Sequence, residues 1–261
     1  MELKEIKINI EEYPKEFECI LQNSKIYDSS CSKQANVIFI DKNNGYFLKK
    51  SKKNSLQKEV LMTKYFNSLN LTCNVLSYVT QDYDYMLTEK ISGNDCIYYK
   101  YLQNPKKLCD TIAEQLVFLH SINPKDCPIK NHTENYLKTA FSNYKSENYD
   151  KSQFLDSFGY KNEEVALKVI ERNKHLLSND TLLHGDYCLP NIILDNWKFS
   201  GFIDLDSGGI GDKHVDIFWG IWTLYYNLKT EKYAKRFIDV YGKEKINFDT
   251  LRLIASIEVF G

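Results

Sequence analysis

The residues best suited to chemistry lie in one segment, His184-Gly185-Asp186-Tyr187-Cys188-Leu189-Pro190-Asn191, and Asp204 follows after a predicted hairpin. Phosphoryl transfer needs a base that orients the attacking hydroxyl and oxygen ligands that hold magnesium on the phosphates. Asp186 offers the base, and Asn191 and Asp204 offer oxygen ligands. Their spacing parallels the catalytic loop of kinases, so the segment predicts a phosphoryl-transfer site.

Each residue of this segment, considered alone, would also fit a structural role. A lone Asp186 would fit a turn-forming acid, because Asp side chains stabilise turns. The combination with Asn191 and Asp204 favours catalysis. We interpret His184 as a brace for the loop through a backbone hydrogen bond, since Asp186 already occupies the position of the base.

The segment 184–191, the run Gly201-Phe202-Ile203-Asp204 and the run from Gly211-Asp212 to Asp216 resemble the aminoglycoside 3′-phosphotransferases. The resemblance extends from about residue 29 to residue 260. It implies a protein-kinase-like fold of two lobes that transfers the γ-phosphate of ATP to a hydroxyl of an antibiotic. It also implies that Asp186 is the base and that Asn191 and Asp204 hold Mg²⁺.

The expected fold class is α+β, with a small N-lobe built on an antiparallel sheet and a larger, mainly helical C-lobe. A chain of 261 residues, 43% of them hydrophobic, is long enough for two unequal lobes. We expect a nucleotide-binding N-lobe over residues 1–90 and a catalytic, substrate-binding C-lobe over residues 91–261. Expected elements are a hairpin of 37–40 with 46–49, a helix over 55–67 capped by Asn54 or Ser55, a helix over 106–120, a hairpin of 191–194 with 198–203 and a helix from Asp216. The periodicity of residues 131–180 is too weak to give boundaries.

The N-lobe should supply a lysine for the phosphates. Lys49 ends a predicted strand and Glu59 lies on the following predicted helix, where it could form an ion pair with Lys49. Taken alone, both would fit solvated surface groups. The C-lobe segment favours a functional interpretation for both.

Two further segments fall where the resemblance implies nucleotide contacts. Ser32 lies in a Ser-rich segment at the position of the loop that covers the nucleotide, and the segment equally fits an ordinary turn. The run from Leu87 to Gly93 resembles the hinge that reads adenine, and Glu89 and Ile91 are the candidates there.

The acceptor is the least constrained part of the interpretation. An aminoglycoside carries ammonium groups and needs carboxylates around it. Glu258 lies near the end of the chain, where the family contributes acid to the antibiotic, although it would also fit a solvated helix position. Choline, homoserine, sugar and macrolide kinases share the catalytic residues, and an inactive nucleotide-binding protein is a further alternative. We assign Asp212 and Asp216 to structure, Asp216 as a cap of its helix.

Composition excludes several partners. The chain has 34 basic and 35 acidic residues, a net charge of -1, so no overall field attracts nucleic acid or an anionic membrane. Its seven cysteines are scattered without a C-x-x-C pair, which argues against a disulfide framework or a zinc site. No signal sequence and no run of about 18 apolar residues occurs. We expect a cytoplasmic protein with a small-molecule partner, no nucleic acid or membrane partner, and an oligomeric state that the sequence does not indicate.

Overall fold

A computed structural model describes residues 4–31, 35–150 and 159–261. The chain divides into two compact units, Met1–Gly93 with Ser200–Asp206, and Asn94–Phe199 with Ser207–Gly261. The segment Ser200–Asp206 was expected in the C-lobe, but it belongs to the first unit. The reason is local: the backbone N–H of Phe202 donates to the carbonyl of Leu71, and the ring of Phe202 packs edge-on against Phe66.

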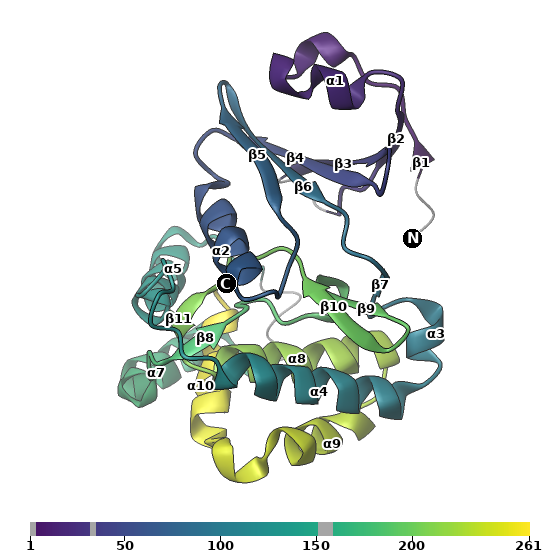
Figure 1. The fold of residues 1–261 in the computed structure, drawn as a ribbon. Coiled ribbons are helices and arrows are strands. Elements are labelled where there is room, and N and C mark those ends of the chain that lie inside the picture. The colour runs from purple at the N-terminus through teal and green to yellow at the C-terminus, as the bar shows by residue number, and fades with distance from the viewer. Residues whose placement is uncertain (1–3, 32–34, 151–158) are drawn as a thin grey trace. The chain divides into compact units, whose positions relative to one another are not determined.

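The first unit is built on a six-stranded sheet in the order β1-β2-β3-β4-β6-β5, and the paired strands are antiparallel (Figure 1). Its strands are β1 (Lys4–Glu5), β2 (Lys25–Asp28), β3 (Ala35–Asp41), β4 (Tyr46–Lys52), β5 (Val75–Thr80) and β6 (Tyr83–Glu89). Its helices are α1 (Glu18–Leu21) and α2 (Gln57–Ser68), with short 3-10 turns at Ile10–Glu12 and Lys15–Phe17. The hairpin expected from residues 37–49 is therefore present as β3 and β4.

The two faces of this sheet carry different layers. Successive side chains on a strand point to opposite faces, and directly paired residues on neighbouring strands share a face. Leu48 pairs with Leu87, and both belong to the core cluster that includes α1. Lys49 pairs with Met86 on the other face, where Met86 packs with Leu56 and Val60 at the start of α2. The alternation of β4 therefore turns Lys49 toward α2.

The start of α2 differs from the expectation that Asn54 or Ser55 would cap it. Leu56 occupies the cap position and makes no side-chain cap. The buried carboxylate of Asp84, on β6, accepts the N–H of Leu56 at 2.9 Å instead. A side chain distant in sequence thus does what a local cap usually does.

The second unit is mainly helical (Figure 1). Its helices are α3 (Tyr99–Leu102), α4 (Pro105–Ser121), α5 (His132–Ser146), α7 (Glu163–Asn173), α8 (His214–Leu228), α9 (Lys232–Tyr241) and α10 (Phe248–Glu258). Its short strands are β7 (Asn94–Asp95), β8 (Thr181–Leu183), β9 (Ile192–Asp195) and β11 (Gly209–Gly211), with 3-10 turns at Lys174–Leu176, Leu189–Asn191 and Lys243–Lys245. β8 pairs with β11, and β9 pairs with β7. β10 (Lys198–Phe202) follows β9 as the other arm of the expected hairpin.

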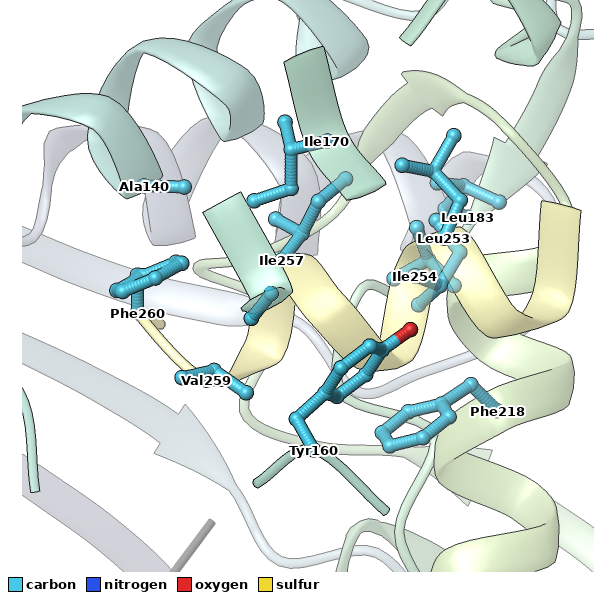
Figure 2. Packing of buried hydrophobic residues seen from close by; sticks show 12 residues of the cluster. Ala140, Tyr160, Ile170, Leu183, Phe218, Leu253, Ile254, Ile257, Val259 and Phe260 are labelled. Carbon is cyan, nitrogen blue, oxygen red and sulfur yellow. The ribbon is translucent and has the colours of Figure 1, made fainter. Parts of the chain in front are cut away.

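One hydrophobic core joins α5, α7, α8 and α10 of the second unit. Leu253, Ile254 and Ile257 on α10 are fully buried against Ile170 of α7 and Phe218 of α8 (Figure 2). Their spacing is that of one helical face. Because Glu258 directly follows Ile257, the packing of α10 fixes where that carboxylate lies.

Among the described residues, no helix is long and apolar enough to cross a membrane.

Candidate active site

Three predicted residues meet in the first unit around the ammonium group of Lys49. Lys49 Nζ lies 2.8 Å from Glu59 Oε2 and 2.8 Å from Asp204 Oδ1. Glu59 comes from α2, on the sheet face toward which Lys49 points, and its side chain is only 5% exposed. The Asp204 side chain is 49% exposed. The predicted Lys49–Glu59 pair is present, and Asp204 joins it from the segment that returns to this unit.

The electrostatics of this group favour the charged lysine. Burial opposes the ammonium form of Lys49, but the facing carboxylates of Glu59 and Asp204 outweigh burial and hold its pKa above the ordinary value. A permanently charged donor between two carboxylates is suited to binding phosphate oxygens.

Asp204 is held in an unusual backbone conformation. Its φ is +60°, in the left-handed region that non-glycine residues seldom adopt, although Asp tolerates it better than most. Thr72 helps to fix the preceding strand, because its hydroxyl donates to the carbonyl of Phe202 at 2.6 Å. Strained backbone of this kind is enriched at functional sites.

The predicted hinge residues lie at the end of β6 and just after it. Glu89 is exposed, and its carboxylate accepts a hydrogen bond from the side chain of Asn74 at 3.3 Å. Ile91 is half-buried against Gly201, where an added Cβ would lie 2.8 Å from Ile91 Cδ1. Ser32 lies outside the described residues.

In the second unit, Asp186 and Asn191 are bonded to each other. Asn191 Nδ2 donates to Asp186 Oδ2 at 2.8 Å and to the Asp186 carbonyl at 3.0 Å. The 3-10 turn Leu189–Asn191 brings the two together. Only the amide nitrogen of Asn191 bonds to Asp186. The amide oxygen can therefore still act as a cation ligand.

The 184–191 loop is anchored at several points. Asp216 accepts the backbone N–H groups of His184 and Gly185, each at 2.8 Å. The fully buried Tyr187 donates its hydroxyl to the carbonyl of Ile112 on α4 at 2.7 Å. Gly185 has a φ of +86°, and a Cβ there would collide with the backbone of Ser207, so only glycine fits. These contacts fix the position of the loop backbone.

Asp216 is structural, as expected, but not as a helix cap. α8 begins at His214, and both carboxylate oxygens of Asp216 turn to the 184–191 loop. His120 Nε2 lies 3.2 Å from Asp216 Oδ2. Burial opposes ionisation of Asp216, yet these hydrogen bonds and the neighbouring histidines hold its pKa below the ordinary value. The role of His120 has no signal in the sequence, because it depends on how α4 packs beside α8.

His184 braces the loop as predicted. Its ring nitrogen Nδ1 accepts the backbone N–H of Asp186 at 3.3 Å, and the residue is fully buried. Cys188, next to Asp186, has its thiol pKa raised by burial and by the Asp186 carboxylate, so it stays neutral.

Glu258 is buried rather than solvated. It is 5% exposed, and its Oε1 accepts the hydroxyl of Tyr136 at 2.5 Å and Nε1 of Trp219 at 3.0 Å. Burial raises its pKa to about 7, the hydrogen bonds from Tyr136 and Trp219 oppose the rise, and the charge of Asp186 adds to it. Sequence reasoning missed Tyr136 and Trp219, which carry no motif.

Magnesium prefers oxygen ligands. Among the residues that the structure describes, no group of three or more His, Cys, Asp or Glu could hold a metal. Asn191 and Asp204 instead offer one amide oxygen and one half-exposed carboxylate. Each of these groups offers oxygen of the kind that Mg²⁺ prefers, and proteins commonly hold Mg²⁺ with one or two oxygen ligands while phosphates and water supply the rest.

Comparison with known proteins identifies the family. The model of the phosphotransferase enzyme family matches residues 30–254. A protein of Lactococcus lactis subsp. lactis (strain IL1403), named probable aminoglycoside 3′-phosphotransferase, is 50% identical over 260 residues, 99% of each chain. An aminoglycoside 3′-phosphotransferase of Niallia circulans is 29% identical over 177 residues, 68% of this chain and 67% of its own.

Solved structures confirm the fold. The crystal structure of an aminoglycoside-3′-phosphotransferase of type VIII superposes with a TM-score of 0.77 at 15% identity, over 99% of this chain and 94% of that one. The phosphotransferase APH(3′′)-Id of Streptomyces rimosus, in complex with ADP and streptomycin, has a TM-score of 0.72 at 18% identity, over 86% and 90% of the two chains. The expected α+β, protein-kinase-like fold class is therefore confirmed. The chain belongs to the phosphotransferase enzyme family and, within it, to the aminoglycoside 3′-phosphotransferases.

Proposed function

We propose that this enzyme uses ATP and Mg²⁺ to phosphorylate a hydroxyl group of an aminoglycoside, and so confers antibiotic resistance. The observation that carries the reaction type is the bonded pair of Asp186 and Asn191 in a rigid loop. The name of the 50% identical relative supports the acceptor class.

In this proposal Asp186 orients the acceptor hydroxyl and receives its proton. The acceptor oxygen forms a bond to the γ-phosphorus while the bond from that phosphorus to the β,γ-bridging oxygen breaks, and ADP leaves. Asn191 keeps the Asp186 carboxylate in one orientation through its amide N–H. Positioning of this kind is the protein's main contribution to phosphoryl transfer.

The first unit binds the nucleotide, and the second carries the base and the acceptor. Lys49, held by Glu59, contacts the phosphates, and Glu89 and Ile91 border the adenine. Ser32, outside the described residues, stays a proposed nucleotide contact on sequence grounds. Asn191 and Asp204 would hold Mg²⁺, which supplies charge neutralisation on the phosphates when bound. The supporting observation is that Lys49 is the charged donor between Glu59 and Asp204.

The acceptor binds near Glu258. Among the residues that the structure describes, the buried carboxylate of Glu258 forms no ion pair. Such burial is energetically unfavourable, and an ammonium group of the acceptor would compensate it. Charge therefore favours a cationic acceptor over a neutral sugar. We place the reaction in the cytoplasm, where ATP is available and where the scattered free thiols remain reduced.

Coupled ADP release from purified protein tests the proposal, with ATP, Mg²⁺ and kanamycin, neomycin, choline, homoserine or a macrolide as acceptor. We expect efficient turnover with at least one aminoglycoside. Turnover with another acceptor alone would keep the reaction type and replace the substrate. ATP binding without turnover of any acceptor would contradict the proposed enzymatic activity.

A further inference from the structure

The carboxylate of Glu258 is held by two neutral donors from two different helices. Tyr136 lies on α5 and Trp219 lies on α8, and both donate to the same oxygen, Oε1. All three residues belong to the second unit. Double donation to one oxygen orients the carboxylate and leaves Oε2 as the oxygen with unused acceptor capacity.

Gly261 lies beside Oε2. A Cβ added at Gly261 would lie 2.8 Å from Oε2, so a side chain at this position would crowd that oxygen. Within the described part of the chain, no Lys, Arg or His forms an ion pair with Glu258. Burial and the negative charge of Asp186 both disfavour the ionised carboxylate of Glu258.

This arrangement is unusual for a purely structural acid. Burying a carboxylate without a cation costs free energy, and a structural role would be served as well by Gln, which accepts the same two hydrogen bonds. A carboxylate retained in such a place, with one oxygen fixed and the other available, is suited to an incoming cation.

We propose that Tyr136 and Trp219 are positioning residues that hold Glu258 as an oriented carboxylate, with Oε2 presented to an ammonium group of the acceptor. The inference rests on the proposed function and deepens it, because it assigns acceptor affinity to two residues that do not touch the reacting atoms.

The inference predicts a pH dependence, because Glu258 binds an ammonium group only when it is ionised. Four groups act electrostatically on this cluster. The charge of Asp186 opposes ionisation of Glu258, Cys188 interacts electrostatically with Glu258, Tyr136 donates a hydrogen bond to Glu258, and Asp212 interacts electrostatically with Tyr136. Burial and the charge of Asp186 raise the pKa of Glu258, and the hydrogen bonds from Tyr136 and Trp219 lower it. Loss of one donor should therefore move ionisation of Glu258 to higher pH.

The test compares Tyr136→Phe and Trp219→Phe with wild type by steady-state kinetics from pH 6 to pH 9. Tyr144→Phe is the matched control, because Tyr144 is also on α5 and packs on Phe260 without a hydrogen bond to Glu258. We expect Tyr136→Phe to raise KM for the aminoglycoside about tenfold near pH 7, as loss of one hydrogen bond to a charged group implies. The KM for ATP and kcat should change little.

The pH profile separates positioning from a merely structural role. In Tyr136→Phe the pH at which acceptor KM falls should move up by about one unit, since the ionised form has lost a donor. A profile that coincides with those of wild type and Tyr144→Phe would overturn the inference. Thermal unfolding verifies that each variant is folded. If Tyr136→Phe does not fold, Trp219→Phe provides the same comparison.

Failure of the proposed function has a different result. Wild-type protein that phosphorylates no aminoglycoside at any pH would contradict the proposed function, and the positioning role with it. Wild-type turnover with unchanged acceptor KM and pH profile in both variants would overturn the positioning role alone.

Discussion

Lys49 Nζ lies 2.8 Å from Asp204 Oδ1, although the two residues are 155 positions apart in the chain. The proposed phosphate ligand and one proposed magnesium ligand are therefore already paired with each other. Lys49 shares the same ammonium group with Glu59. Nucleotide phosphates and magnesium would take over the interactions that Lys49 and Asp204 now make together.

Lys49→Met should lower kcat/KM for ATP by about 100-fold, because two charge-assisted contacts to the nucleotide are lost. Lys50→Met is the matched control: Lys50 is the next residue of β4, points to the opposite face and lies over the ring of Tyr83. Initial rates at varied ATP would measure both. Equal losses in the two variants would mean that position 49 has no special role.

Asp186→Asn should lower kcat by about a thousandfold and leave nucleotide affinity nearly unchanged, because it removes the base and keeps the shape of the side chain. Turnover and ATP binding by calorimetry are the measurements. Asp195→Asn, at the exposed last residue of β9, is the control. Undiminished turnover in Asp186→Asn would remove Asp186 from its proposed role.

Asp204→Asn should raise the Mg²⁺ concentration needed for half-maximal rate by about tenfold or more, because a neutral amide is the weaker ligand. Magnesium titrations at saturating ATP would measure the change. Asn191→Ala should raise the requirement as well, and it should also lower kcat because Asp186 loses its hydrogen-bond donor. An unaltered magnesium requirement in both variants would contradict the assigned ligands.

Asp216→Ala should reduce the free energy of unfolding by roughly 3 kcal/mol at pH 7, because the N–H groups of His184 and Gly185 lose their buried acceptor. The pKa of Asp216 is lowered in the folded state, so its stabilisation is present above its unfolded pKa, near 3.8, and disappears as pH falls below it. Urea unfolding at pH 7 and near pH 3 would measure both effects. The exposed Asp82→Ala is the control. A difference from wild type that is as large near pH 3 as at pH 7 would contradict the ionic role.

Glu258→Gln should stabilise the protein above pH 7, whereas Asp216→Ala should destabilise it. The folded-state pKa of Glu258 is about 7 against 4.5 ordinarily, so the folded protein binds more protons between those values and loses stability as pH rises through them. The difference between the folded-state pKa of about 7 and the ordinary 4.5, at 1.36 kcal/mol per pKa unit, corresponds to a loss of roughly 3 kcal/mol in the free energy of unfolding when Glu258 is fully ionised. Unfolding at pH 8 should show a gain for Glu258→Gln that is nearly absent at pH 4.5. A loss of stability at pH 8 would mean that the charge of Glu258 is already compensated.

Much of the fold followed from local patterns. The turn residues between 41 and 45 predicted the β3–β4 hairpin, and the helical spacing of apolar residues from Leu108 to Leu119 predicted α4. The predicted cap of α2 at Asn54 or Ser55 was wrong, because the carboxylate of Asp84 on β6 accepts the N–H of Leu56 at the start of the helix. The boundary between the units could not be predicted at Ser200–Asp206, since that segment is assigned by its packing on Leu71 and Phe66.

The sequence alone predicted the catalytic set, because Asp186, Asn191 and Asp204 lie close enough along the chain for their spacing to carry meaning. It also predicted that Lys49 and Glu59 form a pair, since strand alternation and helix position are local properties. Only the tertiary structure decided that Glu258 is buried between Tyr136 and Trp219 and that Asp216 holds the 184–191 loop. Those contacts join residues more than 30 positions apart, and the packing of whole helices, which no short pattern encodes, brings them together.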